Sequence, residues 1–191
     1  ASWPVGTGAT ANFTLVRKDS VSEGTSDWNL GQTQWDVYAI DTFAFLGNHT
    51  IIPCGGIVVV PVPTPACTDD IFISEYLEGS SSHKALELYN PMDTTVDLSN
   101  YVIYRYNNGS PSPTDSLFPQ GMPMSDEVFV IGNAGANAAI LAESDTTHTI
   151  TFYNGDDAIE LRKMMTGNVL DIIGIIGVHP GSSWAVETGF N

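Results

Sequence analysis

The sequence predicts an all-β fold in which two sheets pack into a sandwich. Short runs of alternating apolar and polar residues recur along most of the chain, and clusters of Gly, Asn, Asp and Pro separate them. Hydrophobic residues make up 42% of the 191 residues, which is enough for a substantial core. Many short strands with turn signals between them are typical of a β-sandwich.

The C-terminal part of the chain contains most of the expected strands. Two of them end at recognisable turns, Asn90-Pro91 and Asn108-Gly109. Only Asn137 to Ala142 has a helical pattern, of one or two turns. The expected strand segments are residues 71–78, 85–91, 101–109, 127–133, 148–157, 158–163 and 169–177.

The N-terminal part is also predicted to be β, with strands at 12–18 and 33–40 and an aromatic segment at 41–47. It carries a heavy aromatic load for about fifty residues. Such a fragment would leave this apolar surface exposed unless it packs on something else.

A Pro- and Gly-rich stretch divides these two parts. We place an N-terminal piece at 1–53, a linker at 54–67 and a C-terminal domain at 68–191, because three prolines in the linker exclude a helix. Cys54 and Cys67 bracket the linker, and we expect them to form a disulfide, which implies an oxidising, extracellular setting. The alternative is two unpaired thiols.

The charge balance limits the classes of partner. Six Lys and Arg face 22 Asp and Glu, for a formal charge of −16. Binding of nucleic acid requires clustered cations, so we expect no nucleic-acid partner. No apolar run reaches the ~20 residues of a membrane span, and none is expected.

Several phrases of the C-terminal domain resemble those of a known family. They occur in order as I-S-E at 73–75, E-L-Y-N-P at 87–91, N-G-D-D-A-I at 154–159, D-I-I-G at 171–174 and P-G-S-S-W at 180–184. Together they resemble the bacterial lamin-tail domain, which implies an immunoglobulin-like β-sandwich in a secreted or cell-surface protein.

In many members of that family, P-G-x-x-W is followed by T-L-V-R-K, two tryptophan-containing turns and D-T-F-x-x-L-G-x-H-T. Here those elements stand at the N-terminus, at 14–18 and 41–50. The phrase S-W-x-V-x-T-G also occurs twice, at 2–8 and 183–189. The resemblance therefore implies that 1–53 is the end of one sandwich and that 68–191 is the front of the next.

Three arrangements are compatible with this order. The expected one is a subunit whose N-terminal piece completes a neighbouring copy, which propagates head to tail as a filament. The others are a window on a longer tandem-repeat protein, and completion of the chain's own sandwich as a circular permutant. The deciding contact is the copy on which the N-terminal piece packs: the polymer hypothesis fails if this piece folds onto residues 71–184 of its own chain or packs as an independent domain.

The predicted assembly interface consists of the large apolar residues of the N-terminal piece, one cation and the second tryptophan phrase. Arg17 and Lys18 are candidates for ion pairs with the 156–160 region; the alternative is two solvated charges. The interface residues are Trp3, Phe13, Leu15, Arg17, Trp28, Trp35, Phe43, Phe45 and Trp184.

No catalytic constellation is visible, and we expect no enzymatic activity. Asp156 and Asp157 are weak candidates for Ca²⁺ ligands, with Glu75, Glu78 and Glu87 as further oxygen donors, but no EF-hand spacing is present and a structural turn is the alternative. No other cofactor is expected.

Three N-x-S/T sequons, at Asn12, Asn48 and Asn108, leave glycans possible. The expected function is that of an extracellular structural or adhesive subunit. The alternative is a lamin-tail adhesion or binding module of a larger secreted protein, such as a hydrolase or nuclease.

Overall fold

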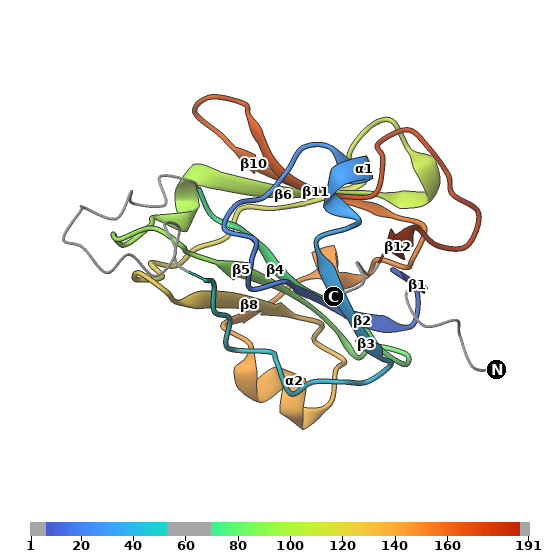
Figure 1. Cartoon of the computed structure of the whole chain (residues 1–191), viewed down its shortest axis with the longest axis horizontal. Helices are drawn as coiled ribbons and strands as arrows, with labels where there is room; N and C mark the ends of the chain where they lie inside the picture. The colour runs from blue at the N-terminus through green and yellow to red at the C-terminus, as the bar shows by residue number, and fades with distance from the viewer. Residues whose placement is uncertain (1–6, 53–69, 188–191) are drawn as a thin grey trace.

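A computed structural model of the chain describes residues 7–52 and 70–187. Figure 1 shows an almost entirely β architecture in which the only α-helices of the described residues are two short ones. The helices are α1 (Trp28–Gly31) and α2 (Ala138–Glu143). The strands are β1 (Thr7–Ala9), β2 (Phe13–Arg17), β3 (Trp35–Ala39), β4 (Phe72–Glu78), β5 (Lys84–Tyr89), β6 (Tyr101–Tyr106), β7 (Asp115–Leu117), β8 (Val128–Gly132), β9 (Thr146–Thr147), β10 (Ala158–Lys163), β11 (Val169–Ile173) and β12 (Ala185–Glu187).

The strands form two main sheets that pack face to face, as an immunoglobulin-like sandwich requires. One sheet has six strands in the order β3-β2-β4-β5-β8-β9, and the other has four in the order β11-β10-β6-β7. A separate two-stranded ribbon pairs β1 with β12. The predicted all-β sandwich is confirmed.

The core lies between the two sheets, and both the N-terminal and the C-terminal part supply it. Ile73 and Tyr76 of β4 both point into it, although residues three apart on a regular strand would lie on opposite faces. A β-bulge between Ile73 and Glu75 explains this, because the extra residue turns the rest of the strand over. From the N-terminal part, Leu15, Trp28 and Trp35 are buried in the same core.

A second, smaller cluster covers the opposite face of the six-stranded sheet. Residues 40–52 cross this face next to α2, as the teal trace in Figure 1 shows. Leu46 from this segment packs with Leu77, Ala85, Val130 and Ile140. The sheet is therefore buried on both faces, which accounts for the continuous burial of β4.

Two local expectations have different outcomes. The predicted helix at 137–142 is present as α2, and the Asn137 side chain caps it by accepting from the Ile140 amide. The strand expected over 148–157 is wrong. Residues Thr149–Thr151 instead form a 3₁₀ turn, because the His148 ring accepts from the Ile150 amide and starts the turn.

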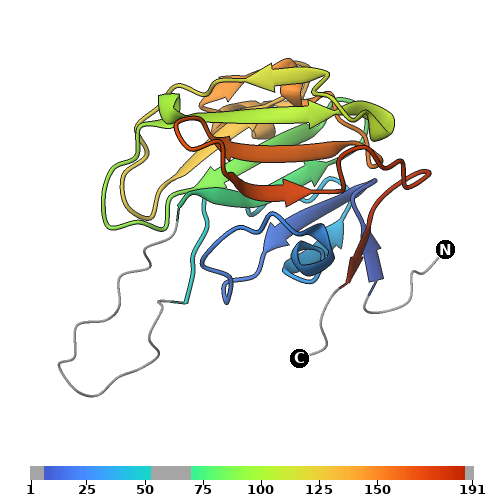
Figure 2. The same ribbon diagram turned by 90° about the horizontal axis from the view of Figure 1, so that it is seen from above.

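Residues 7–52, here called the N-terminal segment, complete the sandwich of their own chain. The remaining described part, residues 70–187, is called the acceptor. Strand β2 pairs antiparallel with β4, and β1 pairs antiparallel with β12. Figure 2 shows the blue strands of the segment beside the rest of the sandwich, with β1 next to the dark red β12. The expected packing on a neighbouring copy is thus not the arrangement seen, which is the self-completing one.

Candidate functional site: the seat of the N-terminal segment

Strand β2 joins the segment to the acceptor by adding to the edge of β4. The register pairs Thr14 with Leu77, Leu15 with Tyr76 and Val16 with Glu75. On its other side β2 carries β3, so the segment extends the sheet by two strands. Removal of the segment would leave the β4 edge as a row of unpaired amides and carbonyls, which is a template for another strand.

A buried ion pair fastens β2 to the opposite sheet. Arg17 donates through Nη2 to Oδ2 of Asp171 on β11, and both side chains are 0% exposed. Arg17 also donates from Nε to the Ile73 carbonyl (3.0 Å) and from Nη1 to Oε1 of Gln34 (2.8 Å). Burial lowers the pKa of Arg17, and the charge of Asp171 opposes that shift.

Asp171 is the centre of this contact. Its carboxylate accepts from the amides of Ile73 (3.0 Å) and Ile172 (3.0 Å) of the acceptor and of Thr25 (3.1 Å) of the segment. A carboxylate with this many donors is well satisfied as an anion although it is buried. Asp171 thus binds two parts of the segment, the guanidinium of Arg17 and the backbone amide of Thr25.

The expected position of the ion-pair partner was wrong. Among the described residues the ion-pair partner of Arg17 is Asp171 rather than a residue of 156–160, and Lys18 donates to the carbonyl of Thr33 (2.7 Å). Asp171 lies within the D-I-I-G phrase, so the sequence contained the signal. The sequence could not show that the two sheets pack face to face so that Arg17 of one sheet meets Asp171 of the other.

A second contact lies between the start of the segment and the second tryptophan phrase. Thr10 donates from Oγ1 to the Gly155 carbonyl (2.5 Å), and its amide donates to the Trp184 carbonyl (3.1 Å). The Trp184 indole donates to the carbonyl of Asp157 (3.0 Å). The C-terminal phrase therefore runs beside the start of the segment within one chain.

The third contact covers the outer face of the six-stranded sheet. The Gly47 amide donates to Oε2 of Glu87 (2.7 Å), and the His49 ring packs edge-on against Phe72 and Tyr89. Asp41 accepts from the amide of Ser80, which anchors the segment to the β4–β5 turn.

This cover changes the titration of the groups beneath it. Burial, together with the charge of Glu87, raises the pKa of Glu75 to about 9. Burial raises the pKa of Glu87 to about 7, against the hydrogen bonds from Ser74 and Gly47. Burial lowers the pKa of His49 to about 4. The sequence pointed to Glu75 and Glu87 only as further oxygen donors for a Ca²⁺ site, and nothing in it indicated that both are buried beneath the segment.

Most predicted interface residues do lie in the seat, here of the chain's own sandwich. Leu15, Trp28, Trp35 and Arg17 are buried there, whereas Phe13 and Phe43 are half-buried beside the clusters. Phe45 is half-buried and packs on the Tyr38 ring, with 4.3 Å between ring centroids. Trp184 is buried in the main core.

Trp3, Cys54 and Cys67 lie outside the described residues, so the disulfide stays a prediction.

Comparison with protein families supplies the relationship. The family model described as Lamin Tail Domain matches residues 64–177, more than half of the chain. The chain belongs to the lamin-tail domain family. A search of curated proteins returned no match. Among the described residues of this lamin-tail protein, neither helix has the length and apolarity to cross a membrane.

The candidate Ca²⁺ ligands of the lamin-tail domain hold the turn together. Asp157 accepts from the amides of Asn108 (2.9 Å) and Asn154 (3.2 Å). Asp156 instead faces His179, with 3.0 Å between Oδ2 and Nε2. Among residues 7–52 and 70–187, no three His, Cys, Asp or Glu side chains are grouped so as to hold a metal ion. Calcium binding stays an untested prediction.

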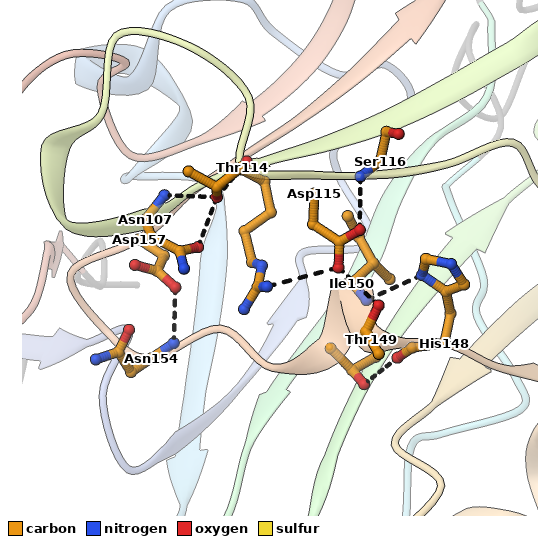
Figure 3. Close-up of polar contacts among 11 residues, drawn as sticks. Asn107, Thr114, Asp115, Ser116, His148, Thr149, Ile150, Asn154 and Asp157 are labelled. Carbon is orange, nitrogen blue, oxygen red and sulfur yellow. Dashed lines mark hydrogen bonds and ion pairs between the residues drawn. The ribbon is translucent and has the colours of Figure 1, made fainter.

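Figure 3 shows how the polar residues around this turn are used. The ion pair of Arg105 with Asp115 joins β6 to β7, and Thr149 donates to Asp115 (2.8 Å). Asp157 and Asn154 bond to each other within the turn. The NGDD phrase of the lamin-tail domain therefore has an evident structural role at the end of the sandwich where Trp184 and Thr10 meet.

We expect Gly155→Ala to loosen the N-terminal segment of this lamin-tail domain. A methyl group at position 155 would lie 2.7 Å from the backbone N and Cα of Ala11, so the backbone of the segment must shift. Overpacking of this kind costs about 1–3 kcal/mol. Thermal unfolding would measure it, with Gly135→Ala as the control because its methyl group meets side chains and no backbone, those of Ser82 at 3.2 Å and Asn133 at 3.4 Å. Equal stability of the two variants would contradict the close fit.

Proposed function

We propose that this chain is a non-enzymatic, extracellular structural module that assembles head to tail when copies exchange their N-terminal segments. The observation that carries the proposal is the seat itself. The segment supplies two strands of the six-stranded sheet, a buried cation and the cover of one sheet face to an acceptor whose β4 edge is otherwise unpaired. Its net charge of −16 and its bracketing cysteines support an extracellular setting.

The same contacts serve within one chain or between two. Every hydrogen bond of β2 to β4 and every contact of Arg17 with Asp171 can form with an acceptor from another copy, because both partners are present in each chain. Exchange of an identical element is a low-cost route to oligomers. An exchange that is not reciprocal leaves one free segment and one free acceptor, and it therefore propagates as a filament.

Concentration selects between the two forms. A segment tethered through residues 53–69 experiences an effective concentration on the order of mM at its own acceptor. Dilute protein is then the closed monomer seen in the structure. Crowding on a cell surface favours exchange, and the surface array is the form in which the proposed function operates.

The closed form supports a second candidate function. A lamin-tail domain that completes itself is a self-sufficient unit that can serve as an adhesion or binding module of a larger secreted protein. The two candidates differ in one property, which is whether the segment ever occupies another copy's acceptor.

A non-enzymatic role is consistent with the polar cluster that joins the segment to the β4–β5 turn. Ser80, His83 and Asp41 do meet, as the residues of a hydrolase would. The Ser80 hydroxyl and the Asp41 carboxylate, however, both approach the same His83 nitrogen, Nδ1, at 3.3 Å. Nucleophilic catalysis needs the serine and the acid on opposite nitrogens of the ring, so this cluster is an anchor for the segment.

Mixing two full-length variants tests exchange. Arg17→Ala spoils the donor and leaves the acceptor intact, whereas Asp171→Ala does the opposite. Each alone is expected to be destabilised. When they are mixed at mM concentration, the intact donor of one can occupy the intact acceptor of the other, which restores one ion pair. The expected result is a new species of twice the mass or more, with a higher melting temperature.

The control for mixing is the double variant, in which no donor or acceptor is intact. When the double variant is mixed with either single variant, it should form no more oligomer than it forms alone. If the mixture melts as the sum of its two components and stays monomeric, exchange does not occur, and the self-sufficient binding module is the better description.

A further inference from the structure

Two glutamates lie side by side beneath the N-terminal segment. Glu75 of β4 and Glu87 of β5 are register partners, and each is 1% exposed. On its other side, Glu75 is paired with Val16 of the segment. Across the sheet face above them runs the segment's stretch of residues 40–52, which contacts Glu87 through Gly47.

The two carboxyl groups differ in their hydrogen bonds. Glu87 accepts from the Ser74 hydroxyl (2.7 Å) and from the Gly47 amide (2.7 Å), so it is satisfied as an anion. Neither oxygen of Glu75 has a hydrogen-bond partner among the described residues, although both are buried. A buried carboxylate without donors and next to another carboxylate is strongly disfavoured, so Glu75 is held as the neutral acid.

We propose that protonation of Glu75 controls attachment of the N-terminal segment, which stays seated while this carboxyl is neutral and detaches when it ionises. Ionisation in the closed form places a second negative charge beside Glu87 with no donor to receive it. Detachment removes β2 and the cover of residues 40–52, and water then reaches the charge. In the proposed function, this device would regulate the exchange of segments between copies, and its biological role rests on that function. Detachment itself requires only one chain.

The direction of the pH dependence follows from the raised pKa. The pKa of Glu75 rises from 4.5 when it is free to about 9 when the segment is seated, so the seated form binds the extra proton between these values. Attachment is therefore strongest below pH 4.5 as far as Glu75 is concerned, and it weakens as pH rises to 9. Glu87 acts in the same direction up to about pH 7.

Other ionisable groups near the pair act outside the decisive range. His49 opposes the glutamates, because its pKa is lowered to about 4 and its protonation weakens attachment as pH falls from 6.5. Tyr38 and Tyr153 interact with Glu75, but burial raises the pKa of both above 10. The negative charge of Asp145 adds to the rise in the pKa of Glu87. Between pH 7 and 9 the change therefore comes from Glu75.

Hydrogen exchange of the full-length protein at low concentration tests this device. Corrected for the intrinsic pH dependence of exchange, the opening constant of β2 and β3 amides is expected to rise about tenfold per pH unit from pH 7 to 9. Amides of β6 and β10 lie in the sheet that the segment does not extend, and they should stay protected.

Two variants separate the proposal from a general alkaline instability. Glu75→Gln and Glu75→Met both remove the titrating group, and either should abolish the rise in opening of β2 and β3. Glu160→Gln is the matched control, since it removes a fully buried carboxyl from the other sheet and should leave the rise unchanged. If either Glu75 variant folds and keeps the tenfold dependence, the proposal is overturned.

The outcome is independent of exchange between copies. A loss of the pH dependence in the Glu75 variants supports the device even if the mixed Arg17 and Asp171 variants never associate. Conversely, association of those variants with a pH-independent opening of β2 rejects the device and retains the proposed function. If β6 and β10 open together with β2 and β3, the segment has no separate equilibrium and the device is rejected.

Discussion

Replacing Asp171 with alanine is expected to lower the free energy of unfolding by about 3–5 kcal/mol, because it leaves the guanidinium of Arg17 buried without its counter-ion. The remaining partners of that cation are the Ile73 carbonyl and Gln34. Arg17→Ala should cost less, since Asp171 keeps its three backbone donors. Urea denaturation at neutral pH, followed by tryptophan fluorescence, measures both.

A double-mutant cycle with Arg17→Met and Asp171→Leu gives the coupling between the two charges. Because each single variant leaves one buried charge behind, the double variant is expected to be more stable than Asp171→Leu alone. Costs that simply add, with a coupling below about 0.5 kcal/mol, would show that the pair does not hold the segment on the opposite sheet.

Replacing Trp35 with alanine is expected to cost about 3–5 kcal/mol as well. The ring is fully buried in the main core, and the Arg17 guanidinium lies 3.9 Å from its centroid. Its removal opens a cavity between β3 and the opposite sheet and deprives the cation of a π face. The same denaturation experiment measures the loss.

Trp35→Phe is the matched control for this site. The indole nitrogen of Trp35 has no hydrogen-bond partner in the described part of the chain, so phenylalanine removes a buried donor that is already unsatisfied. It also retains an aromatic face for Arg17. We expect Trp35→Phe to lose well under half of what Trp35→Ala loses, and similar losses would mean that the retained phenyl ring stabilises the site neither by its volume nor by its aromatic face.

Local sequence patterns predicted the elements well where a stretch followed a single periodicity, either the alternation of a strand or the repeat of a helix. Alternation in 85–91 and 158–163 corresponds to β5 and β10, and the only helical pattern corresponds to α2. The strand expected over 148–157 failed because a side-chain cap at His148 competes with the extended backbone. Patterns of apolar residues do not report such local hydrogen bonds.

The apolar residues of the candidate site were predicted, whereas the roles of its buried acidic residues were missed. Leu15, Trp28 and Trp35 stood out because a short fragment with so much apolar surface must be covered. Asp171 did not stand out, and Glu75 did so only as an oxygen donor for Ca²⁺, because an acidic residue on an alternating strand normally faces water. Their burial depends on which segment covers the sheet, and local periodicity carries no information about that.

The sequence by itself determined the fold class and the family, and it predicted that the N-terminal part must pack on a sandwich, as residues 7–52 do in the structure. Those properties follow from short-range periodicity, from phrases in a fixed order and from apolar load. Only the tertiary structure decided that the segment completes its own chain, because donor and acceptor phrases are identical in every copy and their pairing is equally good in sequence terms. Tertiary structure also decided the partner of Arg17 and the burial of Glu75, since both depend on contacts between strands that lie far apart along the chain.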